Sequence, residues 1–180
     1  DHHARLDLTL EEAFHGGAKT IDLRHPELAA DGQVAMRNRT LRVNVPAGVT
    51  DGQVIRLAGQ GSAAVGEGTA GDLYLQLRVL PHADFELDGR DVTTRLPLAP
   101  WEAALGTTVS VPTLGGSVEM KIPAGARAGQ KLRLRGRGLP GQPPGDQYVG
   151  LQIVLPPADS PRARELYEAM RRDLAFDPRA

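Results

Sequence analysis

Cysteine is absent from this chain of 180 residues, and its absence excludes several kinds of site. A disulfide framework, a cysteine-ligated zinc site, an iron–sulfur cluster and a cysteine nucleophile all require thiol groups, and a chain without them fits a reducing compartment. Aromatic residues are also scarce, so the core must consist mainly of Val, Leu, Ile and Ala. No apolar run approaches the roughly 18 residues of a membrane span, and we expect no contact with a membrane.

Net charge is nearly missing as well, because 21 Lys and Arg almost balance 22 Asp and Glu. The balance is uneven along the chain: residues 91–180 carry 12 basic and 9 acidic residues, whereas residues 1–90 carry 9 and 13. The segment between Glu119 and Asp146 has no acidic residue. Besides Lys121, it holds five closely spaced cations: Arg127, Lys131, Arg133, Arg135 and Arg137. Because its net charge is close to zero, the chain as a whole is not a polycation that would bind nucleic acid indiscriminately.

A repeated sequence divides the chain into two related halves. Residues 45–61 read VPAGVTDGQVIRLAGQG, residues 122–138 read IPAGARAGQKLRLRGRG, and nine of these 17 aligned positions are identical. Flanking segments repeat in the same order, with residues 6–17 matching 96–107 and residues 71–80 matching 145–154. The period exceeds that of solenoid repeats, so each unit is expected to be a small domain. We expect domains over residues 1–88 and 89–158, followed by a tail over residues 159–180.

Alternation of apolar and polar residues dominates both units. Leu41, Val43 and Val45 alternate with polar residues, as do the apolar residues of segment 73–79, and this pattern is typical of half-buried strands. Short helices are expected only at Leu10–His15 and Pro100–Leu105, where acidic residues lie early, at the end that the helix dipole favours. The sequence therefore predicts a mainly β fold, with two tandem homologous β-sandwich domains.

The tail differs from both units because its pattern is helical. A serine–proline pair at 160–161 is a typical helix start, and the helix is predicted to end near residue 175. A helix this short is marginally stable on its own, so its apolar side must be buried. We expect that side to pack against a second chain and form a homodimer. The residues expected at the interface are Leu166, Tyr167, Met170 and Leu174.

No arrangement of residues in the sequence indicates catalysis or a bound metal. The five histidines form no HExxH motif and no pair spaced four residues apart. Gly-rich segments at 59–61 and 136–138 lack the spacing of a phosphate-binding loop and are interpreted as turns. The tripeptide His25-Pro26-Glu27 is interpreted as a loop after a strand. We therefore expect a binding protein without enzymatic activity, cofactor or metal.

The order of these motifs resembles that of a known family over essentially the whole chain. LTLEEAFHGG, VPAGVTDGQVIRLAGQG, GDLYLQLRVLPHADF, LPLAPWEAALGTTVSVPTLGG and IPAGARAGQKLRLRGRG follow one another in this order. They resemble the C-terminal half of DnaJ-type (J-domain) co-chaperones, most closely the curved-DNA-binding J-proteins of bacteria. The J-domain, the Gly/Phe-rich linker and the CxxCxGxG repeats of that family do not occur in this sequence. Between Leu23 and Leu41, where zinc-binding members carry their cysteine-rich module, only a loop is expected, which indicates the zinc-free second class.

This resemblance implies a co-chaperone with two tandem β-sandwich domains and a C-terminal helix that dimerises. Such proteins hold unfolded polypeptide clients and deliver them to a DnaK-type chaperone. The resemblance also implies a shallow apolar groove in the first domain, between strands at 5–8 and 19–23, that takes an extended peptide. Its expected residues are Leu6, Ile21 and Leu23, with Leu75 beneath them and Lys19 at the rim. The alternative is that these aliphatic residues are ordinary core.

The basic segment of the second unit supports a different function. Lys131, Arg133, Arg135 and Arg137 are all odd-numbered, so on one strand they would share one face. Such a face is either merely solvated or contacts the phosphates of double-stranded DNA without sequence preference. We expect a cytoplasmic protein, associated with the nucleoid if DNA is bound. A carbohydrate-binding sandwich is a weaker alternative, because the only Trp, Trp101, lies in a short-helix motif.

Overall fold

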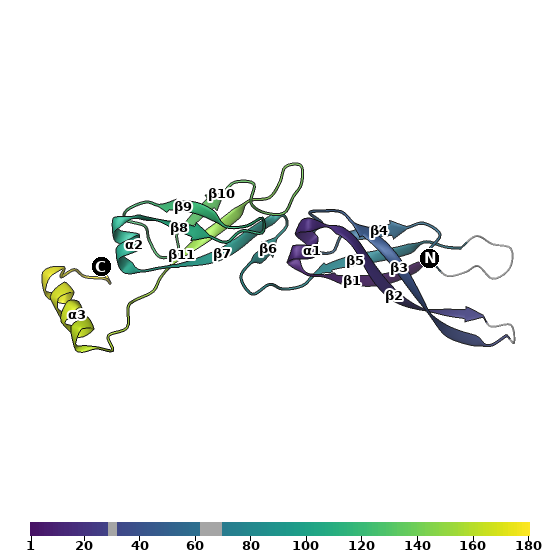
Figure 1. Ribbon diagram of the computed structural model, residues 1–180, viewed down its shortest axis with the longest axis horizontal. Coiled ribbons are helices and arrows are strands. Elements are labelled where there is room, and N and C mark those ends of the chain that lie inside the picture. The colour runs from purple at the N-terminus through teal and green to yellow at the C-terminus, as the bar shows by residue number, and fades with distance from the viewer. Residues whose placement is uncertain (29–31, 62–69) are drawn as a thin grey trace.

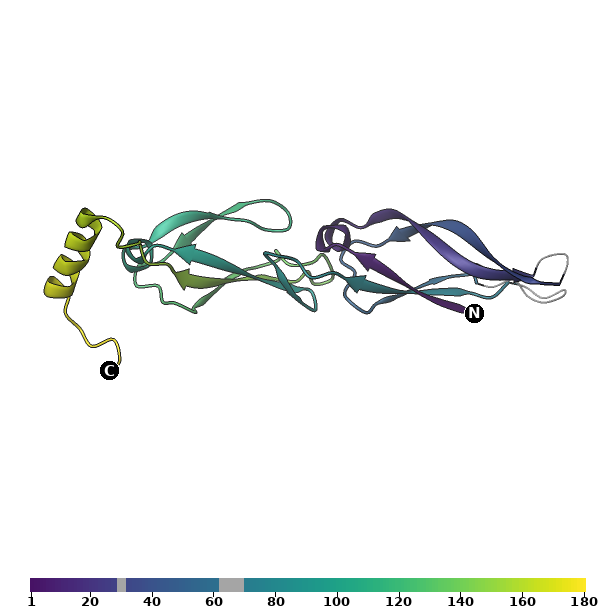
Figure 2. The ribbon, with the colours of Figure 1, turned by 90° about the horizontal axis from the view of Figure 1, so that it is seen from below.

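The computed structural model describes residues 1–28, 32–61 and 70–180. The chain is elongated, with two β-rich units placed end to end and a single helix beyond the second unit (Figure 1). In the perpendicular view, each unit consists of two facing layers of strands (Figure 2). This architecture confirms the mainly β fold that the alternation predicts, and the repeat of sequence is also a repeat of structure.

In the first unit, a three-stranded sheet packs against a two-stranded one. The larger sheet has the order β1-β5-β4, with β1 parallel to β5. Its strands are His2–Leu8, Leu73–Val79 and Val54–Leu57. The smaller sheet pairs β2 (Gly17–Leu28) with β3 (Val34–Val45). Alternate aliphatic residues of both sheets fill the space between them, with Val43 and Leu75 at the centre, and their burial is the main driving force for folding.

The second unit repeats this plan with one additional strand. Its larger sheet has the order β10-β11-β7-β6, and β11 runs parallel to β7 as β5 does to β1. These strands are Lys131–Leu134, Gln147–Ile153, Asp91–Leu98 and Glu86–Asp88. The smaller sheet pairs β8 (Thr107–Val111) with β9 (Val118–Ile122). A second cluster of aliphatic residues fills the space between these sheets.

The additional strand bears on where the domains divide. β6 forms a hairpin with β7 of the second unit, through the pairing of Asp88 with Asp91. A boundary at residue 88 therefore falls inside this hairpin. We propose that the division lies in the connection between Val79 and Glu86, where β5 has ended and β6 has not begun.

Both short helices form over the predicted residues, α1 at Leu10–His15 and α2 at Pro100–Leu105. Thr9 and Glu12 begin α1 with reciprocal hydrogen bonds. The Thr9 hydroxyl accepts from the Glu12 N–H at 3.1 Å, and the Glu12 carboxylate accepts from the Thr9 N–H at 2.8 Å. In α2, the Glu102 carboxylate accepts from the N–H of residue 99 at 2.9 Å. Each helix closes one end of its unit (Figure 1).

The segment between Leu23 and Leu41 is a long hairpin and not the loop that the sequence predicts. β2 continues to Leu28 and β3 begins at Val34, so residues 25–27 also lie in a strand. Figure 1 shows this hairpin projecting beyond the rest of its unit. Over residues 34–40 of β3 every side chain is exposed. The apolar alternation that marks a half-buried strand is therefore missing here.

The two units meet through a close approach of backbone. Gly48, in the turn after β3, has a φ of 81°, and its N–H donates to the Ala13 carbonyl of α1 at 2.7 Å. A Cβ on Gly48 would lie 2.0 Å from the carbonyl oxygen of Pro140 in the second unit. A Cβ on Gly115 of the second unit would lie 3.5 Å from the ring of Phe14. The α1 end of the first unit is thus covered by the second unit.

The tail forms α3 (Pro161–Asp173), beginning where the serine–proline pair predicts. The Ser160 hydroxyl accepts from the Ala163 N–H at 3.1 Å, which satisfies one of the free donors at the helix start. No residue of α3 is buried. Among the helices in the described part of the chain, none combines the length and the hydropathy that crossing a membrane requires.

Candidate functional site

The two strands expected to border a peptide groove are both edge strands. Among the described strands, β1 pairs only with β5 and β2 only with β3, so each has a second edge without a strand partner. Lys19 links the two edges, because its ammonium donates to the Asp7 carbonyl and to the Glu12 carboxylate, both at 2.8 Å. The bond from Lys19, together with that from the Thr9 N–H, lowers the pKa of Glu12. Lys19 is therefore a fixed cation at the rim.

The aliphatic residues of the expected groove lie mostly in the core of the first unit. Leu6, Ile21 and Leu75 have 5%, 9% and 0% of their surfaces exposed, and all three belong to the core of the first unit. Leu23 is only partly buried and packs on that core from its edge. The structure thus places Leu6, Ile21 and Leu75 in the core of the first unit, and Leu23 is the most accessible of the four aliphatic residues.

The basic segment of the second unit starts on a strand and continues into a turn. Lys131 and Arg133 lie on β10, whereas Arg135 and Arg137 follow after the strand has ended. All four side chains are exposed. The prediction that they share one strand face holds only for the first two, because the chain turns at Gly136, which has a φ of 71°.

Arg133 has a structural partner that the sequence analysis missed. Its Nε and a terminal nitrogen lie 2.7 and 2.6 Å from Oδ2 of Asp146, and the Gly136 N–H donates to Oδ1 at 2.7 Å. The bond from Gly136, followed by that from Arg133, lowers the pKa of Asp146. The first unit repeats the arrangement with Arg56, Gly59 and Asp72. The recurrence of this arginine and of a Gly-Asp pair in both units was the signal available in the sequence.

Strand register brings a further cation onto the same face. Lys131 of β10 and Arg95 of β7 lie opposite Gly150 of β11, one on each side of it. In the next row, Arg133 lies opposite Tyr148. No local pattern connects Arg95 with the basic segment, since only the pairing of distant strands places them on the same face of the sheet. Arg95 is therefore a candidate that sequence reasoning alone does not find.

An apolar surface lies at the α2 end of the second unit. Trp101 and Leu105, both on α2, are 57% and 78% exposed. Trp101 lines a shallow hollow of about 340 Å³ together with Val154 and Leu155, which follow β11. Side chains of this size are usually buried, and a contiguous exposed group of them marks an interaction surface.

The tail helix has an uncovered apolar side as well. Leu166, Met170 and Leu174 are 54%, 44% and 64% exposed. Tyr167 differs from the other three expected interface residues. It is partly buried, and its hydroxyl donates to the Pro156 carbonyl of the preceding linker at 2.5 Å, so it holds the helix against its own chain.

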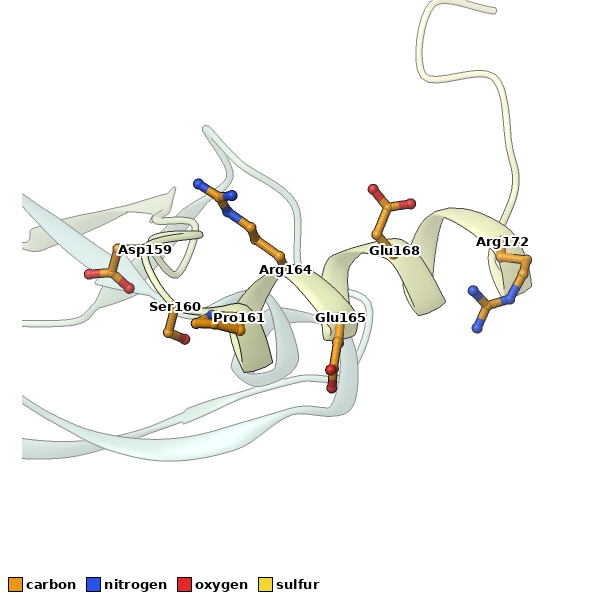
Figure 3. Close-up of a pocket in the computed structure, with 7 residues that line it drawn as sticks. All are labelled: Asp159, Ser160, Pro161, Arg164, Glu165, Glu168 and Arg172. Atoms are coloured by element: carbon orange, nitrogen blue, oxygen red, sulfur yellow. The ribbon is translucent and has the colours of Figure 1, made fainter.

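The polar side of α3 borders an open hollow of about 740 Å³ that does not have the character of a ligand site. Figure 3 shows that Arg164 and Glu165 point to opposite sides of the helix and that Arg172 lies at its far end. Glu165 instead pairs with Arg162 at 3.1 Å. Divergent charges of this kind solvate a helix and do not converge on a bound molecule. The described residues likewise contain no group of three or more His, Asp or Glu that could hold a metal ion.

Comparison with known proteins places this arrangement in context. The chain matches the family described as DnaJ C terminal domain over residues 2–156. It is 50% identical over 180 residues to a protein of Coxiella burnetii named "Curved DNA-binding protein", covering 99% of this chain and 58% of that protein. Proteins of the same name from Pseudomonas syringae pv. tomato and Pseudomonas putida are 43% identical over 183 and 182 residues, covering 100% and 99% of this chain and 58% and 57% of theirs. The chain thus spans less than two thirds of the length of these curated relatives.

Proposed function

Because the chain belongs to the DnaJ C-terminal domain family, we propose that it binds unfolded polypeptides for delivery to a DnaK-type chaperone. The observation that carries the proposal is the pair of unpaired strand edges, β1 and β2, on either side of an aliphatic floor. An extended polypeptide can form main-chain hydrogen bonds to such an edge whatever its sequence. The proposed role requires no reaction and no cofactor.

The floor accounts for the breadth of clients that such a role demands. Leu6, Ile21 and Leu23 present methyl groups and no directional polar group, so alternate side chains of a client are recognised by their apolar character alone. The floor is shallow because most of its atoms already belong to the core. Affinity for one segment is therefore expected to be weak and fast to reverse, which suits a protein that passes its client on.

Leu23 offers the sharpest test of this groove. Leu6 and Ile21 are so deeply buried that replacing them would also weaken the core, whereas Leu23 is only partly buried. We expect Leu23→Ser to reduce the suppression of aggregation of an unfolded model protein while the fold persists. The matched control is Val109→Ser, a partly buried aliphatic residue on β8, the counterpart of β2 in the second unit. Full activity of the Leu23 variant, or equal loss in both variants, would show that the groove lies elsewhere.

We further propose that two chains associate through α3. Its three exposed apolar residues have no partner within the described chain, and an isolated helix of this length is marginally stable. Two-fold symmetry lets the same surface serve both partners. Two grooves in one dimer then raise the effective concentration of binding sites for a client with several apolar segments.

Binding of duplex DNA is a second candidate function. It is favoured by the exposed cations at and after β10 and by the name "Curved DNA-binding protein" of the relatives. Clustered Lys and Arg give sequence-independent affinity that falls steeply with salt, whereas capture of an apolar peptide does not. Titration with duplex DNA at increasing salt therefore separates the two functions. A cytoplasmic protein associated with the nucleoid is the setting in which both would operate.

A further inference from the structure

The outer face of the larger sheet in the second unit carries a row with two cations that strand pairing brings together. Lys131 and Arg95 lie on either side of Gly150, on the strands that flank β11. Their sequence neighbours Leu132 and Leu96 pack on the core, so the two cations point outward, and both are exposed. Since neighbouring strands are about 4.8 Å apart, the cations stand about 10 Å from each other with bare backbone between them.

Glycine at position 150 is not required by the backbone. Gly150 is absent from the glycines with positive φ, and a Cβ there would meet only the Thr94 carbonyl oxygen at 3.5 Å, an ordinary contact distance. In the first unit the equivalent position is Gln76, flanked by Val54 and Arg5. Of the two units, the second alone combines an open position with a cation on each side. The glycine leaves space above the sheet that the fold itself does not need.

The adjacent row carries one exposed charge of each sign, Arg133 on β10 and Glu86 on β6. Arg133, in the adjacent row, is held in place by its ion pair with Asp146. That carboxylate also accepts the Gly136 N–H, so its charge is already compensated by two donors. Arg135 and Arg137 extend the exposed positive charge past the end of β10.

We propose that Arg95, Gly150 and Lys131 form a cradle for a phosphate group of the duplex DNA backbone. The proposal rests on the DNA-binding function above and names the site that performs it. A phosphate oxygen can approach the sheet over Gly150, where no side chain blocks it, while the two cations reach it from the sides. Contacts of this kind position the duplex without reading its sequence.

A pair of substitutions at one residue tests the cradle. Gly150→Glu places a carboxylate between the two cations. Gly150→Gln introduces an uncharged side chain of the same size, the residue that the first unit has at the equivalent position 76. The probe is a short duplex DNA of mixed sequence, titrated against the whole chain at several salt concentrations. We expect the Glu variant to bind at least about tenfold more weakly at low salt, with a salt slope smaller by about one contact, and the Gln variant to stay within about threefold.

A second pair removes a cation without filling the space. Arg95→Ser should weaken binding, while Arg5→Ser, at the equivalent position of the first unit, should not. Circular dichroism verifies that each variant is folded. If a Gly150 variant is unfolded, the comparison of the Arg95 and Arg5 variants provides the test instead. Equal affinities of the Glu and Gln variants, or of the Arg95 and Arg5 variants, would overturn the cradle and leave DNA binding elsewhere on the chain. Failure of the unsubstituted chain to bind duplex DNA would refute the DNA-binding function and the cradle together.

Discussion

Asp72 and Asp146 show how a single carboxylate organises the end of a strand in both units. Each accepts from the arginine of the neighbouring strand and from the N–H of the glycine in the turn that follows it. The backbone bond is the first cause of the lowered pKa in both cases, and the arginine contributes further. The first role of Arg56 and Arg133 is therefore structural, because each binds the aspartate that holds the following turn in place.

Because of these carboxylates, the stability of the folded chain changes with pH in the acid range. Because their pKa values lie below the ordinary 3.8 in the folded chain, the unfolded chain takes up protons first as the pH falls. Their stabilising contribution is complete above the unfolded pKa and is lost as the pH falls through the lower, folded pKa. We expect Asp146→Asn to lower the Tm at pH 7. As the pH drops toward 2, the Tm of the variant should approach that of the unsubstituted chain. Thermal unfolding followed by circular dichroism at a series of pH values measures this, and a pH-independent difference would contradict it.

At the scale of elements, the success of sequence reasoning followed the strength of local signals. The short helices and α3 were predictable because Thr9, Glu102 and Ser160 begin them with recognisable capping chemistry. The β2–β3 hairpin was not, since residues 34–40 of β3 all have exposed side chains and so lack the alternation that reveals a strand. The position of Arg95 was not predictable either, because only the pairing of β7 with β11 brings it opposite Gly150.

The tail helix supplies the prediction that belongs to this scale. Replacing Leu166 and Met170 together by Ser should convert a dimer into a monomer that still folds, because neither residue is buried within its own chain. A double substitution of exposed Arg162 and Arg171 to Ser is the matched control and should leave the dimer intact. Sedimentation at micromolar concentration decides between the two states. A dimer that persists in the Leu166 and Met170 variant would assign the interface to another surface.

At the scale of the whole molecule, the contact of Gly48 with Pro140 determines how the units are joined. Gly125 is the equivalent glycine of the second unit, with a φ of 78° against 81° for Gly48, but a Cβ on it would meet nothing within 4 Å. Alanine at either position carries a backbone strain of roughly 1–2 kcal/mol. Only at Gly48 would it also collide with the second unit.

Comparing alanine at these two positions therefore separates the effect of the contact between the units from the effect of backbone strain. We expect Gly48→Ala to destabilise the chain by at least about 1 kcal/mol more than Gly125→Ala, since overpacking at a close contact typically costs 1–3 kcal/mol. Urea unfolding of the two variants gives the comparison. Equal losses would mean that the units are not held together at this point in solution.

The repeated plan has a consequence for the outer end of the second unit. In the first unit, the α1 positions that correspond to Trp101 and Leu105 are Glu11 and His15, and Glu11 is bonded to His82 at 2.7 Å beside the joint. Here the polar residues are at the internal end, while Trp101 and Leu105 lie exposed at the terminal one. Two copies of one plan therefore present opposite chemistry at equivalent helices, polar where the two units meet and apolar where the second unit faces solvent.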